Sequence, residues 1–229
     1  MSNPCSRTSV IIPVKNGKQF IAQALGSVLE QLASDDEIIV VNDASTDDTH
    51  SVVAALLDPR IFLIEGVGRG VSSARNIGLA AATGEFIAFL DHDDLWPTQR
   101  HRIMLQAMLD DSQLDAVFGR IRVQFDQGGT RWEWLLPQDG HHAPGANLGN
   151  ALYRSVMLRK IEGFDESLHY GEDFDYFFRL QQAGLRYATC DVDGMIYRRH
   201  ADNASNNQAA MNSMIFNLIR RRRAAERVK

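Results

Sequence analysis

The chain has 229 residues, of which 45% are hydrophobic and 23% are charged, and its formal net charge is -5. This composition is typical of a soluble globular protein with a core of its own, and the negative charge argues against general nucleic-acid binding. Only Cys5 and Cys190 are present, so neither a disulfide scaffold nor a zinc site is expected. The apolar runs are strand-sized, which predicts a cytoplasmic protein without a membrane span or a secretory signal.

The first 96 residues alternate between strand and helix signals. Runs of β-branched and apolar residues predict strands at 9–14, 37–41, 60–65 and 86–90. Helical stripes and start signals predict helices at 20–32, from a capping box at 45–48 toward residue 57, and at 72–82. Repeated βα units predict an α/β fold with a mostly parallel central sheet flanked by helices.

The pattern changes after Pro97. A helix through 104–109 is followed by a strand signal at 116–125 and a glycine turn at 127–130, which predicts a small antiparallel hairpin. Residues 137–149 lack periodicity and are expected to form a loop, with a mobile lid as one interpretation. Further helices are expected at 155–161 and 173–184.

Residues 206–229 predict a basic amphipathic C-terminal helix. Apolar residues recur at helical spacing from Met211 to Leu218, and four arginines follow at 220–223. Such a helix can lie on an anionic lipid surface, or its apolar stripe can pack on the domain while the arginines are solvated. The sequence leaves both alternatives open.

A carboxylate cluster, Asp91-His92-Asp93-Asp94, directly follows the strand expected at 86–90. Ligands in open α/β sheets bind outside the carboxyl ends of the strands, and carboxylate oxygens there suit hard divalent cations and phosphates. The cluster therefore predicts a metal-assisted phosphate site. The alternative is a polar turn that only precedes the next helix.

Five segments together resemble the family-2 inverting glycosyltransferases with the GT-A fold. They are VIIPVKN at 10–16, VNDASTD at 41–47, GVSSARNIG at 70–78, FLDHDD at 89–94 and GED at 171–173. The resemblance extends to about His200 and implies a Rossmann-like GT-A domain over residues 1–205. It implies a nucleotide-sugar-binding half at 1–96 and an acceptor-binding half at 97–205, with residues 206–229 as an appended helix.

The resemblance assigns a set of residues to the nucleotide-sugar donor. They are Pro13, Val14, Asn16, Asp43, Arg75, Asp91 and His92. Asp43 is expected to accept hydrogen bonds from the base, and Arg75 to contact the nucleotide or its diphosphate. The alternatives are that Asp43 only begins a turn and that Arg75 is a surface helix residue. Family members commonly have Asp and Gly where this chain has Asn42 and Ala44.

The metal and the general base come from two further motifs. Asp91 and Asp93 match the family's Asp-x-Asp, and with His200 they imply a site for Mn²⁺ or Mg²⁺ that bridges the donor phosphates. The imidazole of His200 would favour manganese, unless it is simply solvent-exposed. Asp173 matches the general base of the family, with Glu172 as the second candidate and an ordinary first-turn acid as the alternative. Direct displacement with inversion needs one such carboxylate.

The acceptor side is expected to use Trp96, Trp132 and Trp134, although strand tryptophans also fill cores and interfaces. The resemblance implies a UDP-sugar donor, as a first expectation, and a carbohydrate, lipid-linked or protein-linked acceptor in cell-surface glycan or glycoconjugate synthesis. Contact with the inner face of the membrane and a homo-oligomer stay open.

Three rival functions fit parts of the sequence. A dehalogenase-type phosphatase would have Thr or Val where this chain has Leu95, and a nucleotidyltransferase would have a glycine-rich, lysine-bearing N-terminal loop. Intact acids at all three sites, Asp43, Asp91 with Asp93, and Glu172 with Asp173, argue against a non-catalytic sugar-nucleotide-binding module.

Overall fold

A computed structural model describes residues 6–125, 147–203, 206 and 207. A seven-stranded sheet with the order β3-β2-β1-β4-β6-β5-β7 runs through it. The strands are β1 (Thr8–Val14), β2 (Glu37–Asn42), β3 (Ile61–Glu65), β4 (Phe86–Phe89), β5 (Ala116–Phe125), β6 (Ala151–Arg154) and β7 (Tyr187–Arg199). The helices are α1 (Ile21–Leu29), α2 (Thr49–Ala54), α3 (Val71–Ala81), α4 (Arg100–Asp110), α5 (Ser155–Leu158) and α6 (Glu172–Gln182), with a 3-10 turn, η1, at Leu148–Asn150.

The first four strands form the parallel part of the sheet, as the sequence predicts. β1 lies between β2 and β4, with Val10 opposite Ile38 on one side and Ala88 on the other. All residues of β1, β2 and β4 are buried, because helices cover both faces of a parallel sheet. This burial explains the continuous apolar runs, and the four strands agree with the expected ranges to within one residue.

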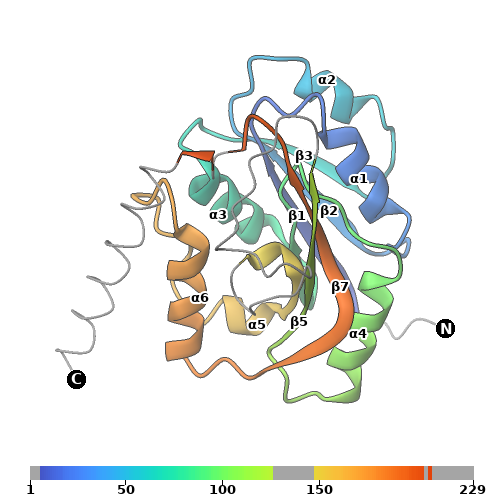
Figure 1. The fold of residues 1–229 in the computed structure, drawn as a ribbon, viewed down its shortest axis with the longest axis vertical. Coiled ribbons are helices and arrows are strands. Elements are labelled where there is room, and N and C mark those ends of the chain that lie inside the picture. Colours follow the sequence, from blue (N-terminus) through green and yellow to red (C-terminus); the bar gives the residue numbers. More distant parts are fainter. Residues whose placement is uncertain (1–5, 126–146, 204–205, 208–229) are drawn as a thin grey trace.

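Two helical layers enclose the sheet, which Figure 1 shows nearly edge-on, with α1, α2 and α4 on one side and α3, α5 and α6 on the other. Successive residues of β1 point to opposite layers: Val10 and Ile12 pack in the core with α1, whereas Ile11 packs in the core with α3. Gly78 allows α3 to approach the sheet, since a Cβ there would lie 2.4 Å from Ile11. The small-residue helix is therefore close to the sheet, as expected.

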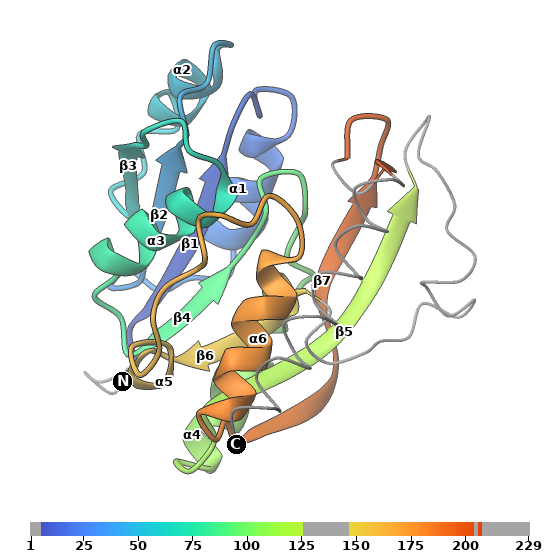
Figure 2. The same ribbon diagram turned by 90° about the vertical axis from the view of Figure 1, so that its left-hand side faces the viewer.

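The second half of the sheet contains pairings that the sequence did not predict. β5 is one continuous strand that pairs antiparallel with β6 and parallel with β7, and Figure 2 shows β5 and β7 curving together at the far edge of the sheet. The turn of the expected hairpin and its second strand, near Trp132 and Trp134, lie outside the described residues. The register of β5 and β7 shifts around Gly119, where the two backbones approach so closely that a Cβ on Gly119 would lie 2.6 Å from the Cα of Gly194.

Local details at helix starts also differ from the sequence prediction. The capping box at 45–48 does not form: α2 begins at Thr49, and the side chain of Asp48 makes no capping hydrogen bond. Instead, Asp47 accepts a hydrogen bond from the backbone N–H of Thr49 at 3.0 Å. In the described part of the chain, no helix has the length and apolar character needed to cross a membrane. Apart from residues 206 and 207, the basic tail is outside that part.

Candidate active site

A cavity with a volume of about 650 Å³ opens at the carboxyl ends of β1, β2 and β4. Residues from both halves of the chain line it, including the first turn of α6 and the segment that follows β7. Every residue predicted for the donor, the metal and the base lies at this cavity: Pro13, Val14, Asn16, Asp43, Arg75, Asp91, His92, Asp93, Glu172, Asp173 and His200. The specific donor contacts of Pro13, Val14 and His92 stay predictions.

Asp43 organises the loop that leads into α3. The carboxylate is buried and accepts hydrogen bonds from the backbone N–H groups of Gly68 at 2.8 Å and Gly70 at 2.7 Å. Both glycines have positive φ angles, of 75° and 97°, which suits residues without a Cβ. Ala44 also has a positive φ, 57°, a conformation that glycine adopts more easily than alanine, in agreement with the glycine that the family resemblance implies at this position. The contact of Asp43 with a base stays a prediction.

Asn16 joins the loop after β1 to the loop after β2. Its backbone N–H donates to the hydroxyl of Ser45 at 2.9 Å, and its side-chain oxygen accepts from the backbone N–H of Thr46 at 2.8 Å. Two of the five recognised segments therefore hold each other in place at the rim of the cavity. The sequence order alone gives no sign of this contact, because the partners are 29 and 30 residues apart.

Arg75 is buried, which excludes the alternative of a surface helix residue. Its guanidinium forms ion pairs with Asp91 at 2.8 Å, Glu172 at 3.1 Å and Asp173 at 2.5 Å. Burial opposes the charge, but the three carboxylates raise the pKa of Arg75 above its usual value, so the side chain is a permanent cation. Arg75 lines the cavity predicted for the donor, but its guanidinium is directed at acids of the protein, and its contact with the donor stays a prediction.

Asp173 lies in the first turn of α6, after Gly171, whose φ of 77° begins the turn. One carboxylate oxygen pairs with Arg75, and the other accepts a hydrogen bond of 3.4 Å from the backbone N–H of Leu148. Burial raises the pKa of Asp173 to about 7, against the lowering effect of Arg75 and with a further rise from Glu172. A carboxylate with a pKa near neutrality can take up a proton at working pH and release it again.

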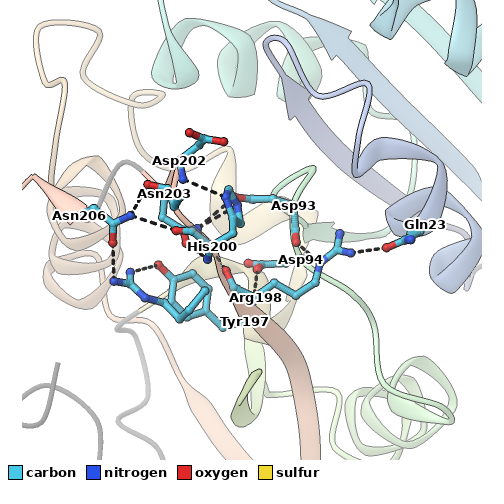
Figure 3. A network of polar contacts seen from close by, with 11 residues as sticks. Gln23, Asp93, Asp94, Tyr197, Arg198, His200, Asp202, Asn203 and Asn206 are labelled. Carbon is cyan, nitrogen blue, oxygen red and sulfur yellow. Dashed lines mark hydrogen bonds and ion pairs between the residues drawn. The ribbon is translucent and has the colours of Figure 1, made fainter. Parts of the chain in front are cut away.

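His200 contacts Asp93 across 107 residues of sequence, as Figure 3 shows. The Nε2 atom of His200 lies 3.0 Å from Oδ2 of Asp93, and the imidazole is buried, so the solvent-exposed alternative is wrong. Burial disfavours the charge on Asp93, but the hydrogen bond with His200 and the nearby His92 hold its pKa below the usual value. The Nδ1 atom of His200 accepts a hydrogen bond from the backbone N–H of Asp202 at 3.3 Å, which orients the ring.

Asn203 is a site residue that the sequence analysis missed. Its side-chain oxygen accepts from the backbone N–H of His200 at 2.5 Å, and its amide nitrogen lies 3.3 Å from both Asp93 Oδ2 and His200 Nε2 (Figure 3). The sequence could have indicated Asn203 as a site residue, because it lies three residues after His200 in the same short polar segment. Asn203 therefore orients both members of the pair.

Asp94 has a structural role beside the site. Its carboxylate is fully buried and accepts a hydrogen bond from the backbone N–H of Arg198 at 2.9 Å, while the Arg198 side chain donates to the carbonyl of Asp93 and, at 2.5 Å, to Gln23. Leu95 pairs with Ile196 through two backbone hydrogen bonds. Burial raises the pKa of Asp94 well above its usual value. These contacts fix β7 against the loop that carries Asp91, Asp93 and Asp94, here called the acidic loop.

Asp93 and His200 fit a divalent cation once the imidazole proton moves to Nδ1. In the structure Nδ1 accepts a hydrogen bond, so Nε2 carries the proton and donates it to Asp93. Adjacent ligands of an octahedral ion, with bonds of about 2.1 Å, are separated by about 3 Å, and the two atoms here are 3.0 Å apart. No cluster of three or more metal-binding side chains occurs among the described residues, and Asp91 is turned toward Arg75. Two protein ligands are enough where substrate phosphates and water complete the shell. Asp91 as a direct metal ligand stays a prediction.

The aromatic residues correct the expected acceptor side. Trp96 is only 3% exposed, belongs to the core beside α1, and stacks on His101, with the guanidinium of Arg100 4.1 Å from its ring. The prediction that Trp96 binds the acceptor is therefore wrong, whereas Trp132 and Trp134 lie outside the described residues. The aromatic side chains that do line the cavity are Phe20, Tyr170, Phe174 and Tyr197. Tyr170 and Phe174 directly flank the Gly-Glu-Asp motif at 171–173, and this position in the sequence could have indicated that they line the site.

The comparison with protein families gives the decisive match. The family model described as "Glycosyl transferase family 2" matches residues 9–204, which include every strand of the sheet but one residue of β1. The chain belongs to glycosyl transferase family 2. Within this family 2 chain, the match covers the acidic loop, the start of α6 and His200 alike.

Some relatives of the chain have a named activity or pathway, and two of them are compared below. The family 2 chain is 28% identical to the UDP-Glc:alpha-D-GlcNAc-diphosphoundecaprenol beta-1,3-glucosyltransferase WfaP of Escherichia coli, over 87% of this chain and 80% of WfaP. It is 32% identical to the succinoglycan biosynthesis protein ExoO of Rhizobium meliloti, over 82% of this chain and 59% of ExoO. The family 2 chain thus spans about three fifths of some of its relatives.

Solved structures show the same GT-A fold. The S. aureus TarS 1-349 complex with UDP-GlcNAc has a TM-score of 0.71 and 22% identity, over 88% of this chain and 61% of TarS 1-349. The mannosyltransferase PcManGT from Pyrobaculum calidifontis, in complex with GDP-Man and Mn²⁺, has a TM-score of 0.66 and 22% identity, over 86% of this chain and 58% of PcManGT. The expected fold class, a mostly parallel sheet flanked by helices, is confirmed.

Proposed function

We propose that this family 2 chain transfers a sugar from a nucleotide-diphosphate sugar to an acceptor hydroxyl, with inversion, in a reaction that depends on Mn²⁺ or Mg²⁺. The observation that carries the proposal is the arrangement of two sites at one cavity. Asp93 and His200 form a pair with cation-ligand spacing, and Asp173, with its pKa raised to about 7, lies at the same cavity on α6. A leaving diphosphate and an attacking hydroxyl need these two functions on opposite sides of one carbon.

Each residue then has a defined task. Asp173 accepts the proton of the acceptor hydroxyl as the oxygen attacks the anomeric carbon, and its burial keeps its pKa close to working pH. Asp93 and His200 would hold the divalent ion, and Asn203 would orient both side chains. When bound, the ion neutralises charge on the departing nucleoside diphosphate. Because the acceptor attacks directly, the chain needs no nucleophile of its own.

The relatives support the choice of substrates. WfaP is named for UDP-Glc and a diphosphoundecaprenol-linked acceptor, TarS binds UDP-GlcNAc, and ExoO takes part in succinoglycan synthesis. PcManGT binds GDP-Man with Mn²⁺. We therefore propose a UDP-sugar as the first donor to test, with a lipid-linked saccharide as acceptor, in the synthesis of a cell-surface glycan.

Product release tests the proposal against its rivals. Purified protein is incubated with UDP-glucose, UDP-GlcNAc or GDP-mannose, with and without Mn²⁺, in the presence of undecaprenyl-diphosphate-linked GlcNAc. We expect release of the nucleoside diphosphate that requires both Mn²⁺ and acceptor, and a new β-linkage in the product. Binding of the donor without release would support the non-catalytic module, and release of inorganic phosphate instead would support the phosphatase.

A further inference from the structure

One buried arginine connects the acids of the two sites. Arg75 has a side chain that is 3% exposed, and its ion pairs reach Asp91 after β4 and both acids at the start of α6. Building on the proposed function, we propose that Arg75 is a positioning residue that orients the base Asp173 and links it to Asp91, and that it is not a ligand of the donor diphosphate.

The hydrogen-bonding capacity of the guanidinium is largely used within the protein. Nη1 donates to Asp173 and Glu172, and Nη2 donates to Asp91, so three of the five N–H groups of Arg75 are engaged. Nε is buried and has no hydrogen-bond partner among the described residues. Turning the guanidinium toward a phosphate would leave three partly buried carboxylates without their cation, which opposes the movement.

The surroundings of Arg75 also restrict its movement. The next residue, Asn76, binds the backbone of Phe164 in both directions, accepting from its N–H at 2.7 Å and donating to its carbonyl at 2.9 Å. The ring of Phe164 then lies 5.4 Å from the guanidinium carbon of Arg75 and stacks on Tyr176 of α6 with centroids 4.0 Å apart. The guanidinium is therefore held between α3 and α6 by packing on one side and carboxylates on the other.

This arrangement gives the guanidinium a geometric task that a simple cation could not perform. A planar fork can hold carboxylates in two directions at fixed angles, whereas a lysine ammonium is a single point charge on a flexible stem. Asp91 is two residues from Asp93, so the same guanidinium fixes the base relative to the cation pair. Its replacement should disturb the placement of Asp173 and leave the nucleotide contacts in place.

The test compares Arg75→Lys, Asp173→Asn and the double variant in the acceptor-dependent assay. The matched control is Arg154→Lys, because Arg154 also pairs with an acid, Glu85 at 2.7 Å, and lies against an aromatic ring, but outside the cavity. Arg75→Lys should lower turnover at saturating donor by roughly tenfold to a hundredfold, while UDP affinity in Mn²⁺, measured by calorimetry, changes by less than about twofold. The control should keep both values, and thermal unfolding should show that all variants are folded.

The double variant gives the sharper result. If Arg75 acts through Asp173, adding Arg75→Lys to Asp173→Asn should lower the residual turnover by less than about twofold, because the oriented carboxylate is already lost. A fall in UDP affinity matching the fall in kcat/KM, or an additive loss in the double variant, would overturn the proposal. Wild-type turnover by Arg75→Lys would overturn it as well. A wild-type protein that binds UDP in Mn²⁺ but transfers no sugar would instead refute the proposed function. In that case, a loss of UDP affinity in Arg75→Lys would still show that Arg75 is a donor ligand.

Discussion

Replacing Asp173 with asparagine removes the proposed base with almost no change in shape. The amide cannot accept the proton of the acceptor hydroxyl, so turnover should fall by roughly a hundredfold or more. Donor affinity should stay within about twofold, because Asp93 and His200 are unchanged. In wild-type protein, turnover should rise about tenfold per pH unit up to about pH 7 and then level off, since burial raises the pKa of Asp173 to about 7.

The same substitution should change how stability depends on pH. Between the ordinary carboxyl pKa of 3.8 and the native value of about 7, the folded protein holds a proton at Asp173 that the unfolded chain has lost. The stabilising effect of this proton is therefore complete below about pH 4 and is lost as the pH rises toward about 7. At about 1.4 kcal/mol for each pH unit, the loss is at most about 4 kcal/mol. The Asp173→Asn variant should show no such loss of stability, because its amide has no proton to release over this pH range.

Two measurements separate these expectations. Urea unfolding of both proteins at pH 5 and pH 8 should show the Asn variant gaining stability relative to wild type at the higher pH. Acceptor-dependent release of the nucleoside diphosphate across the same pH range should show the wild-type rise and its absence in the variant. Parallel pH dependence of stability in the two proteins would refute the raised pKa, and wild-type turnover by Asp173→Asn would remove Asp173 as the base and direct attention to Glu172.

Three further changes test other parts of the site. Asp93→Asn should abolish the Mn²⁺ dependence of UDP binding in calorimetry, because the neutral amide loses the charge that holds the cation; wild-type affinity in Mn²⁺ would contradict this role. Asn203→Ala should weaken Mn²⁺ binding in the presence of UDP by roughly tenfold to a hundredfold, as expected for a residue that orients metal ligands, and unchanged binding would show that the pair needs no support. Trp96→Ala should lower the free energy of unfolding, measured in urea, by about 3–5 kcal/mol. At low temperature it should not raise the KM for the acceptor, and a raised KM would return Trp96 to the acceptor-binding residues.

The first half of the fold could be predicted because its signals are local. The strands of the parallel sheet are buried on both faces, so each appears as an uninterrupted apolar run, and β1 shows this along its whole length. β7 gives no such signal, since its first residues alternate between exposed and half-buried positions and include Asp191 and Asp193. Its place beside β5 depends on the close approach of Gly119 and Gly194, which is a property of the assembled sheet.

The residues expected to contact the donor, the metal and the acceptor proton do lie at one cavity, but the sequence did not predict their contacts and it missed Asn203. The motifs indicated that Arg75, Asp91 and Asp173 belong to one site, yet the ion pairs span 16 to 98 residues and form only when the folded chain brings the start of α6 to Arg75. Trp96 shows the opposite limit, because a large aromatic side chain has the same sequence signal in a core as at a sugar-binding surface.

The position of His200 at the end of the last strand has a consequence for protein synthesis. The acidic loop with Asp93 leaves the ribosome long before β7, and 107 residues must still be added before the partner of Asp93 exists. A domain generally folds as a unit, so Asp93 meets its partner only after the last strand of the described sheet has been synthesised. If this pair holds the cation as proposed, a product truncated before His200 would lack metal-dependent sugar transfer even though it contains Asp93.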